Sequence, residues 1–550
     1  MVLLVFFTIG LPGCTAQLNP VGSSVSSTDL ISSTTIIEIQ LTPTPFTRLS
    51  SPCSIWLDHT VPISLETQIS SEPGCEISEN PGDAAYRVEI KEWDEGGGSD
   101  GAIWVYALVA PFPTIVDGVT QNQLLDFWRG AHRDIFDGHP IFMTEDTLLA
   151  FTQHWGKPAD GAVQVLLSDE ILTMGWAELP SWAIIPFEDL QPRWKVLEID
   201  GLSPYDTSFD SGKYPLSIQF ELIKNIEGDI SSRPRLPLTN RDPSKYTVVL
   251  LTGTTALVRT TAARMEQKGI PYPAEIIGDV LREADILHIS NEIAFSPSCP
   301  PAIPVRTEMR FCSDPKYFEL LQSIGVDIVE LTGNHLRDWG PEPLLYTLDL
   351  YQDAEIPYYG GGENVEVARQ PVQLEHHGNK IAFIGCNYPG PEVDWATESQ
   401  PGAARCDMEW IEEKVSELKS EGYLTIVTFQ HYEVDDFRPA SAQRVDNLQL
   451  AAEAAPTIIS GSQAHFPQAM TFAGDTFIHY GLGNLFFDQM MPGNRDAFLD
   501  RHIFYNGRYL GVELLTTRMM DYAQPRWMTL EERQDFLDNI FNHSIWNEEK

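Results

Sequence analysis

The sequence predicts an α/β protein in which a smaller α/β domain precedes a larger one. Three observations support this fold class. Hydrophobic residues make up 43% of the 550 residues, which is enough for full-sized cores, and a chain of this length accommodates two or three domains. Strand-like and helix-like segments alternate over residues 52–235 and again from Tyr246 onward, as in α/β folds. The Pro-rich, polar stretch 231–245 lies between these regions and predicts the domain boundary.

The N-terminus predicts export and membrane attachment. Val2 to Ile9 form an apolar run that is too short to cross a bilayer as a helix. The following segment, residues 11–14 (LPGC), resembles a lipoprotein lipobox, in which Cys14 would be lipidated. Residues 1–16 are therefore predicted to be a signal and lipobox region that anchors the protein at the extracytoplasmic face of the cell membrane. An ordinary secretory signal and a short membrane-inserted stub are the alternatives, and both also place the rest of the chain outside the cytoplasm.

The seven cysteines agree with export. If Cys14 carries lipid, six remain, and an even number suits disulfide formation in an oxidising compartment. Six cysteines allow fifteen connectivities, and we expect the pairing of sequence neighbours. The expected pairs are Cys53 with Cys75, Cys299 with Cys312, and Cys386 with Cys406. Buried free cysteines are the alternative.

The region before the boundary divides into a linker and a domain. Residues 17–51 are rich in Ser, Thr and Pro and carry few charges, so they are predicted to be a linker. Residues 52–235 are predicted to form the smaller α/β domain, with a helical segment from Gln121 to Phe136. The run WVYALVAPFPTIVDGVTQNQLLDFWRG resembles the periplasmic-binding-protein class. A scaffold domain that packs on its neighbour is the alternative.

The larger domain repeats a strand-then-helix pattern. Apolar strand-like runs such as TVVLLTG, ILHISNE and KIAFIGC alternate with amphipathic stretches. The predicted helices are Ile276 to Glu283, Lys316 to Ile324, Glu342 to Asp353, Met408 to Ser420 and Gln443 to Ala454. Within the C-terminal segment 521–550, Thr529 and Glu532 have capping-box spacing and predict the start of a final helix.

Polar and chemically capable residues follow the strands of this domain at their carboxyl ends. Sites in open α/β sheets are built at that edge. The clusters are Gly253-Thr254, Asn291-Glu292, Gly333-Asn334-His335 with Asp338, His431-Tyr432-Glu433, Gly461 to His465, and Gly481 to Asn484.

These clusters and the segments around them resemble the CapA family of capsule or poly-γ-glutamate synthesis proteins. The resemblance covers residues 246–520 and includes ADILHISNE, IGVDIVELTGNHLRDWG, VTFQHYE, IISGSQAHFPQ and FIHYGLGNLFFDQ, in that order. Because this family is related to calcineurin-type metallophosphatases, the resemblance implies a metallophosphatase-like four-layer α/β/β/α sandwich for the second half.

The resemblance also implies a site. A metal-assisted phosphoesterase needs imidazoles, carboxylates and amide oxygens around its cations. The implied metal ligands are Asn334, His431 and His465, and the implied catalytic residues are Glu292 and His335. We assign substrate contacts to five further residues: Arg337, Asp338, Glu433, Gln463 and Asn484.

Two positions depart from the family pattern. Thr254 stands where relatives place an aspartate, and Gln463 stands where they place a histidine. Hydroxyl and amide groups bind transition metals less well than carboxylate and imidazole groups, so the sequence predicts one weakly held divalent metal (Mn, Fe or Zn) or none. Alternatively, His431 and His465 are hydrogen-bonded interior histidines, and Glu292 forms a structural ion pair with Arg306 or Arg310.

The expected function is synthesis or processing of a capsule or poly-γ-glutamate polymer. The protein could carry out this function as a metal-assisted hydrolase or transferase. A non-catalytic binding or assembly component of polymer export and a solute-binding lipoprotein are the alternatives. The net charge of −42 argues against nucleic acid as a partner. It also repels polyanions, so a polymer ligand requires local cations. Five arginines near the motifs are candidates: Arg259, Arg306, Arg310, Arg337 and Arg438. A membrane synthesis complex is the expected protein partner.

Overall fold

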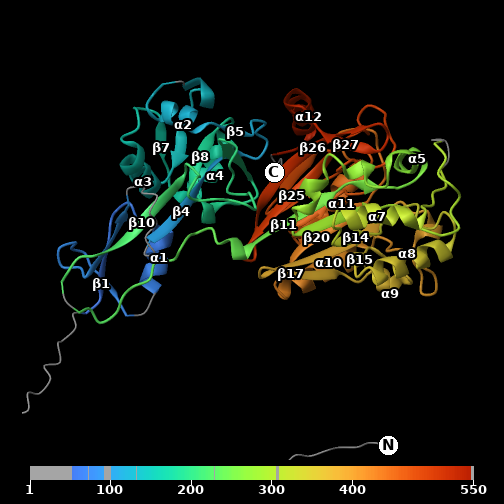
Figure 1. The fold of residues 1–550 in the computed structure, drawn as a ribbon, viewed down its shortest axis with the longest axis horizontal. Helices are drawn as coiled ribbons and strands as arrows, with labels where there is room; N and C mark the ends of the chain where they lie inside the picture. Colours follow the sequence, from blue (N-terminus) through green and yellow to red (C-terminus); the bar gives the residue numbers. More distant parts are fainter. Residues whose placement is uncertain are drawn as a thin grey trace, which may run out of the picture. The chain divides into compact units, whose positions relative to one another are not determined.

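The computed structural model describes residues 52–71, 74–91, 101–131, 133–227, 229–304 and 309–546 (Figure 1). Cys14, the predicted signal and lipobox region 1–16 and the linker 17–51 lie outside the described residues. Among the helices that are described, none has the length and apolar character that a bilayer span requires.

The first half is built on a mixed ten-stranded sheet. Its strands run in the order β2 (Glu76–Ile77), β1 (Ser54–Leu57), β3 (Tyr86–Ile90), β10 (Ser217–Lys224), β4 (Gly101–Pro111), β8 (Trp182–Pro186), β6 (Ile141–Met143) and β7 (Val163–Val165), while β9 (Trp194–Ile199) pairs with β4 and with β5 (Gly118–Val119). The helices are α1 (Ile63–Ser71), α2 (Gln121–Trp128), α3 (Glu145–Trp155) and α4 (Ser168–Ala177). The predicted helical segment 121–136 is divided into α2 and a 3-10 turn, Arg133–Phe136.

The second half contains a nine-stranded sheet in which parallel strands meet antiparallel ones. Its main path is β15 (Tyr358–Tyr359), β14 (Ile328–Glu330), β13 (Ile286–Asn291), β11 (Tyr246–Thr252), β25 (Asp496–Tyr505), β26 (Arg508–Met520) and β27 (Gln524–Trp527), and β12 (Thr254–Thr255) joins β13 to β24 (Asn484–Phe486). The strands from β11 to β15 are parallel, and β25 runs antiparallel to β11. Figure 1 shows β25, from the end of the chain, beside β11, and β26 on the other side of β25.

A six-stranded sheet packs against the nine-stranded one. Its order is β17 (Val372–His376), β18 (Asn379–Asn387), β20 (Leu424–Gln430), β21 (Ile458–Ser460), β23 (Thr476–His479) and β22 (Met470–Ala473). The central strands β18, β20, β21 and β23 are parallel. This sheet therefore also brings several strand ends to one edge.

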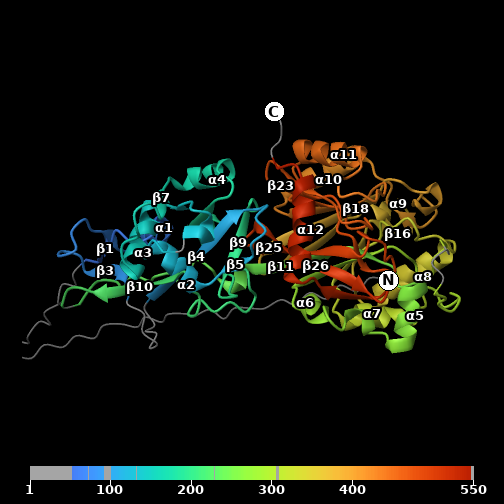
Figure 2. The same ribbon diagram turned by 90° about the horizontal axis from the view of Figure 1, so that it is seen from above.

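Helices cover the outer faces of both sheets. On the nine-stranded sheet lie α5 (Arg259–Lys268), α6 (Gly278–Arg282), α7 (Phe318–Ser323) and α8 (Pro341–Asp353), and on the six-stranded sheet lie α10 (Met408–Ser420) and α11 (Ser441–Glu453) (Figure 2). One apolar core lies under each helical layer, and a third core lies between the sheets. These four layers confirm the predicted α/β/β/α sandwich preceded by a smaller α/β domain.

The helices predicted for the larger domain are all present, but α5 and the short α9 (Val365–Ala368) were not predicted, and neither were α1, α3 and α4 of the first half. The capping box is present: the Thr529 hydroxyl accepts from the backbone N–H of Glu532, and α12 (Leu530–His543) follows. Apolar residues of α12 pack into the core between the sheets, and these are Phe536, Leu537, Ile540 and Phe541.

The two halves share buried contacts. Tyr246 and Val248 of β11 belong to the same core cluster as the sheet of the first half, and Phe112 of the first half packs edge-on against Phe472 and Phe477 of the six-stranded sheet. The described residues of the smaller domain thus pack directly on the larger one.

The three predicted disulfides are confirmed. Cys53 is bonded to Cys75, Cys299 to Cys312, and Cys386 to Cys406. The sequence-neighbour pairing is therefore correct among the fifteen possibilities, and the alternative of free buried cysteines is wrong for these six.

Glu330 connects the two sheets from a fully buried position. It ends β14, and its carboxylate accepts hydrogen bonds from the hydroxyls of Thr332 (2.7 Å) and Ser462, the latter in the loop after β21 of the other sheet. His288 of β13 lies 3.4 Å from the same carboxylate. Burial alone would raise the pKa of Glu330, but His288 and the hydroxyl donors lower it below its ordinary value.

We expect Glu330→Gln to destabilise the protein by about 3–5 kcal/mol in urea unfolding at neutral pH, because it removes one partner of a buried charged network. The folded pKa of Glu330 lies below the unfolded one, so its stabilisation is present above the unfolded pKa and is lost as pH falls through the folded value. The difference between variant and wild type should therefore shrink in acid. Glu398→Gln, at an exposed residue, is the control. Equal stability of the two variants at pH 7 would contradict this role.

Candidate functional site

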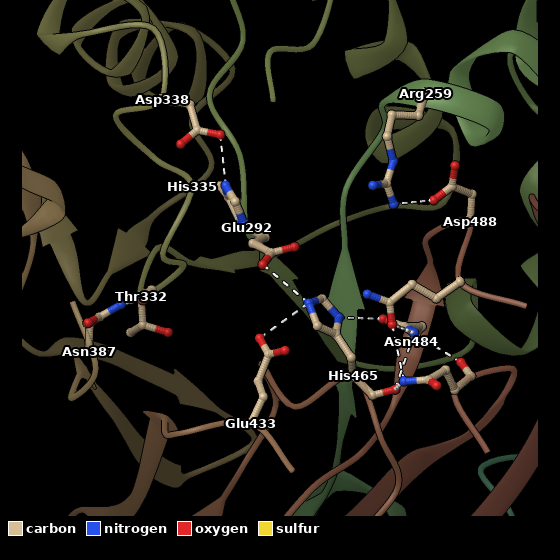
Figure 3. Close-up of polar contacts among 12 residues, drawn as sticks. Arg259, Glu292, Thr332, His335, Asp338, Asn387, Glu433, His465, Asn484 and Asp488 are labelled. Carbon is tan, nitrogen blue, oxygen red and sulfur yellow. Dashed lines mark hydrogen bonds and ion pairs between the residues drawn. The ribbon is translucent and has the colours of Figure 1, made fainter. Parts of the chain in front are cut away.

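The candidate site lies where loops from both sheets meet. Glu292 follows β13, and His335 lies in the loop after β14. From the six-stranded sheet, Glu433 lies in the loop after β20 and His465 in the loop after β21. Asn484 begins β24 of the nine-stranded sheet. Figure 3 shows these side chains converging. This convergence of carboxyl strand ends is the arrangement that the sequence predicts.

Three of these side chains form a compact set of metal-ligand type. Ligand atoms of Glu292, Glu433 and His465 all lie within 4.8 Å of one another. His465 Nε2 is 3.4 Å from an oxygen of each carboxylate. In the described part of the chain, no other group of three or more His, Cys, Asp or Glu side chains has this geometry.

The surroundings of Glu292 fit a cation. Its side chain is fully buried, and among the described residues neither carboxylate oxygen receives a hydrogen bond, with His465 Nε2 lying 3.4 Å away as an ion-pair partner. The amide oxygens of Asn334 and Gln463 are also buried, and no described residue donates a hydrogen bond to either. Buried polar oxygens of this kind normally have a partner, and oxygens with one imidazole nitrogen are a suitable donor set for a divalent transition metal.

Asn484 fixes the orientation of His465. Its amide nitrogen donates to the carbonyl of Asn494 (2.9 Å), so its oxygen faces His465 Nδ1 at 2.8 Å. Because that oxygen only accepts, Nδ1 carries a proton, and Nε2 is directed at the two carboxylates. Burial would lower the pKa of His465, but the charges of Glu433 and Glu292 outweigh it and raise the pKa to about 10.

His335 is oriented by Asp338. Its Nδ1 lies 2.7 Å from the Asp338 carboxylate, which also accepts from the backbone N–H of Phe311 at 2.6 Å. Figure 3 shows His335 between Asp338 and Glu292. Burial would lower the pKa of His335, but the hydrogen bond to Asp338 and the charge of Glu292 raise it. Asp338 therefore holds the histidine rather than extending toward the other site residues.

Two glycines let the loops approach this closely. A side chain at Gly253 would place its Cβ 1.9 Å from the carbonyl oxygen of Gly483, next to Asn484. A Cβ at Gly333 would lie 2.6 Å from the Cα and carbonyl oxygen of Glu292. The loop that carries His335 thus touches the backbone of Glu292, and the segment before Thr254 touches the backbone just before Asn484.

His431, a predicted metal ligand, does not belong to the set around His465. Its Nδ1 accepts from the N–H of Tyr432 (3.2 Å), and its Nε2 faces Asp446 of α11 at 3.4 Å. Its ring stacks on Tyr388 with the centroids 4.7 Å apart. Burial lowers the pKa of His431. In this arrangement neither ring nitrogen is directed at Glu292 or His465, and Glu433 takes the place predicted for His431.

Arg337 does not extend toward the other site residues. The Arg337 guanidinium donates to Gln400 (3.2 Å), and its backbone N–H donates to Asp394. Thr254 is buried in β12, and its hydroxyl has no hydrogen-bond partner in the described part of the chain. Glu292 forms its ion pair with His465 and not with Arg310, which donates to the Asp338 carbonyl. Arg306 lies outside the described residues.

The sequence did not indicate three residues beside the site. Asp488 lies within one of the motifs, but no role was predicted for it. Its buried carboxylate binds the guanidinium of Arg259. Asp394 is buried beside the His335 loop, and burial raises its pKa to about 6. Phe487 packs against His465 with centroids 5.2 Å apart. A carboxylate shortly after a predicted strand was the signal that could have identified Asp488.

Comparisons with known proteins find one matching family model and two curated relatives. Residues 248–489 match the family model described as bacterial capsule synthesis protein PGA_cap. The chain is 25% identical over 191 residues to the capsule biosynthesis protein CapA of Bacillus anthracis, covering 34% of this chain and 46% of that protein. It is 24% identical over 249 residues to the PGA biosynthesis protein CapA of Bacillus subtilis (strain 168), covering 44% and 64%. The chain thus spans less than two thirds of each of these relatives.

Among solved structures, the 5′-nucleotidase precursor of Thermus thermophilus aligns with 53% of this chain and 57% of its own, at 15% identity and a TM-score of 0.32. An ABC-type phosphate transport receptor from Vibrio cholerae aligns with 32% of this chain and 88% of its own, at 14% identity and a TM-score of 0.26.

We expect Gly333→Ala to destabilise the protein by about 1–3 kcal/mol, because the added methyl group overlaps backbone atoms of Glu292 that cannot rotate away. Thermal unfolding with and without added Mn²⁺ measures both the loss and any change in the site. Gly82→Ala, at an exposed glycine with no close backbone neighbour, is the matched control. A Gly333→Ala variant as stable as Gly82→Ala would show that the two loops are not in backbone contact.

Proposed function

Because residues 248–489 form a domain of the bacterial capsule synthesis (CapA) family, we propose that the protein acts outside the cytoplasm on a capsule-type or poly-γ-glutamate polymer, as a metal-assisted hydrolase or transferase. The observation that carries the proposal is the set formed by Glu292, Glu433 and His465. Three disulfides support an oxidising, exported environment, and lipidation of Cys14 would attach the protein to the membrane.

The chain itself supplies a preorganised ligand set. Glu292 and Glu433 offer carboxylate oxygens, and His465 offers Nε2 once its proton is displaced. Asn484 keeps His465 in the required tautomer. A divalent cation such as Mn, Fe or Zn held there would polarise an ester, phosphoester or amide oxygen of the substrate.

His335 is placed to move a proton. Asp338 accepts from Nδ1, so Nε2 is the ring atom left to exchange a proton with a reacting group on the side of Glu292 (Figure 3). The carboxylate also stabilises the imidazolium, which lets His335 act as a general acid near neutral pH. Burial of the neighbouring Glu292 limits access of bulk water to this side of the ring.

A second candidate is a non-catalytic component that binds polymer during its export. Thr254 and Gln463 favour it, because they stand where relatives carry an aspartate and a histidine. Both side chains are buried and uncharged, and neither has a hydrogen-bond partner for its polar side-chain atoms among the described residues. Metal content and turnover together separate the two candidates.

Elemental analysis of the full chain purified without chelator tests the ligand set. We expect about one equivalent of Mn, Fe or Zn, lost in Glu292→Gln and His465→Ala, because each removes one of three ligands. His431→Ala is the matched control and should retain the metal, since His431 faces Asp446. Metal-free wild type, or equal metal in His465→Ala and His431→Ala, would remove the basis of the metal-assisted proposal.

Turnover of p-nitrophenyl phosphate and of γ-glutamyl p-nitroanilide by the metal-loaded protein tests the catalytic part. We expect Asp338→Asn to lower kcat by about 100-fold, in the range of general acid–base effects, with unchanged metal content. His335→Gln should lower kcat to a similar extent, because the two residues act as a unit. Metal binding without turnover of either compound class would favour the binding component.

A further inference from the structure

The two histidines of the site are joined by a continuous stack of side chains. His335 packs on Phe311 with ring centroids 4.2 Å apart, and His465 packs on Phe487 with centroids 5.2 Å apart. The guanidinium of Arg259 lies 4.8 Å from the centroid of Phe311 and 4.8 Å from that of Phe487. A single cation thus contacts both phenylalanines, and each phenylalanine contacts one histidine.

Arg259 is itself held firmly. Only 8% of its side chain is exposed, and it pairs with Asp488, whose side chain is fully buried. The second oxygen of Asp488 accepts from the backbone N–H of Thr260 at 3.0 Å. The start of α5 therefore fixes the carboxylate, and the carboxylate fixes the guanidinium (Figure 3).

The backbone at Arg259 is in an unfavourable conformation. Its φ is +47°, in the left-handed region that glycine adopts without cost and other residues rarely adopt. Strain of this kind persists where the surroundings demand a particular side chain. The small apolar cluster around Phe311 and Phe487, which includes Ala256, Val258 and Ile293, provides such surroundings.

We propose that Arg259 is a positioning residue that sets the separation and ring orientation of His335 and His465 together, through Phe311 and Phe487. The proposal deepens the proposed function and rests on it for its biological meaning. Arginine suits the role because its planar guanidinium stacks on two rings while its edge binds a carboxylate, whereas the compact lysine ammonium cannot do both.

The test uses the full chain with metal removed by chelation and histidine labelled with ¹³C at Cε1. Signals of His335 and His465 are assigned with His335→Gln and His465→Gln. In Arg259→Lys we expect both signals to shift, because the two phenylalanine rings move relative to the imidazoles, while the signals of His288 and His502 stay in place. Far-UV circular dichroism and thermal unfolding confirm that the variant is folded.

Arg241→Lys is the matched control. Arg241 is also buried and lies over three rings, Phe209 at 4.5 Å, Tyr246 at 4.9 Å and Phe187 at 6.0 Å, but it belongs to the junction with the first half. It should leave the signals of His335 and His465 unchanged. If Arg259→Lys does not fold, Asp488→Asn, which loosens the same guanidinium, is expected to shift the same two signals.

The proposal is overturned if neither signal moves or if only one moves. A single guanidinium that positions both imidazoles must change both signals when it is replaced. Metal titration of the same variants tests the proposed function independently of the positioning role. Shifted signals in a protein that binds no metal would leave the positioning role intact and remove the catalytic interpretation. Where metal binds, Arg259→Lys should weaken its affinity about 10-fold or more, as changes behind a metal ligand commonly do.

Discussion

The buried carboxylate of Glu330 is the interaction on which the site depends most directly. It accepts from Thr332, which begins the loop of His335, and from Ser462, which begins the loop of His465. One side chain between the sheets therefore fixes two site loops that come from different sheets. A buried charge is costly unless it is fully hydrogen-bonded, so this network constrains how the sheets can pack and keeps the strand ends in register.

The arginines near the site differ in whether they are already paired within the protein. The net charge of −42 disfavours the approach of a polyanion, so cations beside the site matter. Arg259 is occupied by Asp488, and Arg337 donates to Gln400. Arg310 lies 4.6 Å from the ring centroid of Trp339, at the exposed rim beside Asp338. Arg310 is therefore an exposed cation next to the residue that orients His335.

Much of the fold was readable from the sequence, because its signals are local. The apolar strands, the boundaries of α10, the capping box of α12 and the disulfide pairs all follow from short spacings. Helix α5 was missed because its buried residues include Thr260 and Thr261, which do not form an apolar stripe.

The site was less predictable than the fold. Whether His431 or Glu433 joins the ligand set depends on how the backbone turns after β20, since residues two apart in a loop can face opposite ways. The stack through Arg259 joins segments distant in sequence, and no local pattern encodes such a contact.

The strand order also has a consequence for how the chain assembles. β11 lies between β13 and β25, and its residues 246–252 pair with residues 499–505. As synthesis proceeds from the N-terminus, β11 and β13 are complete long before β25 exists. One edge of a partly built sheet then presents unpaired backbone groups, which are a template for association with other chains. A nascent molecule must be shielded until its last strands emerge, and a chain truncated before residue 496 would keep that edge exposed and adhesive.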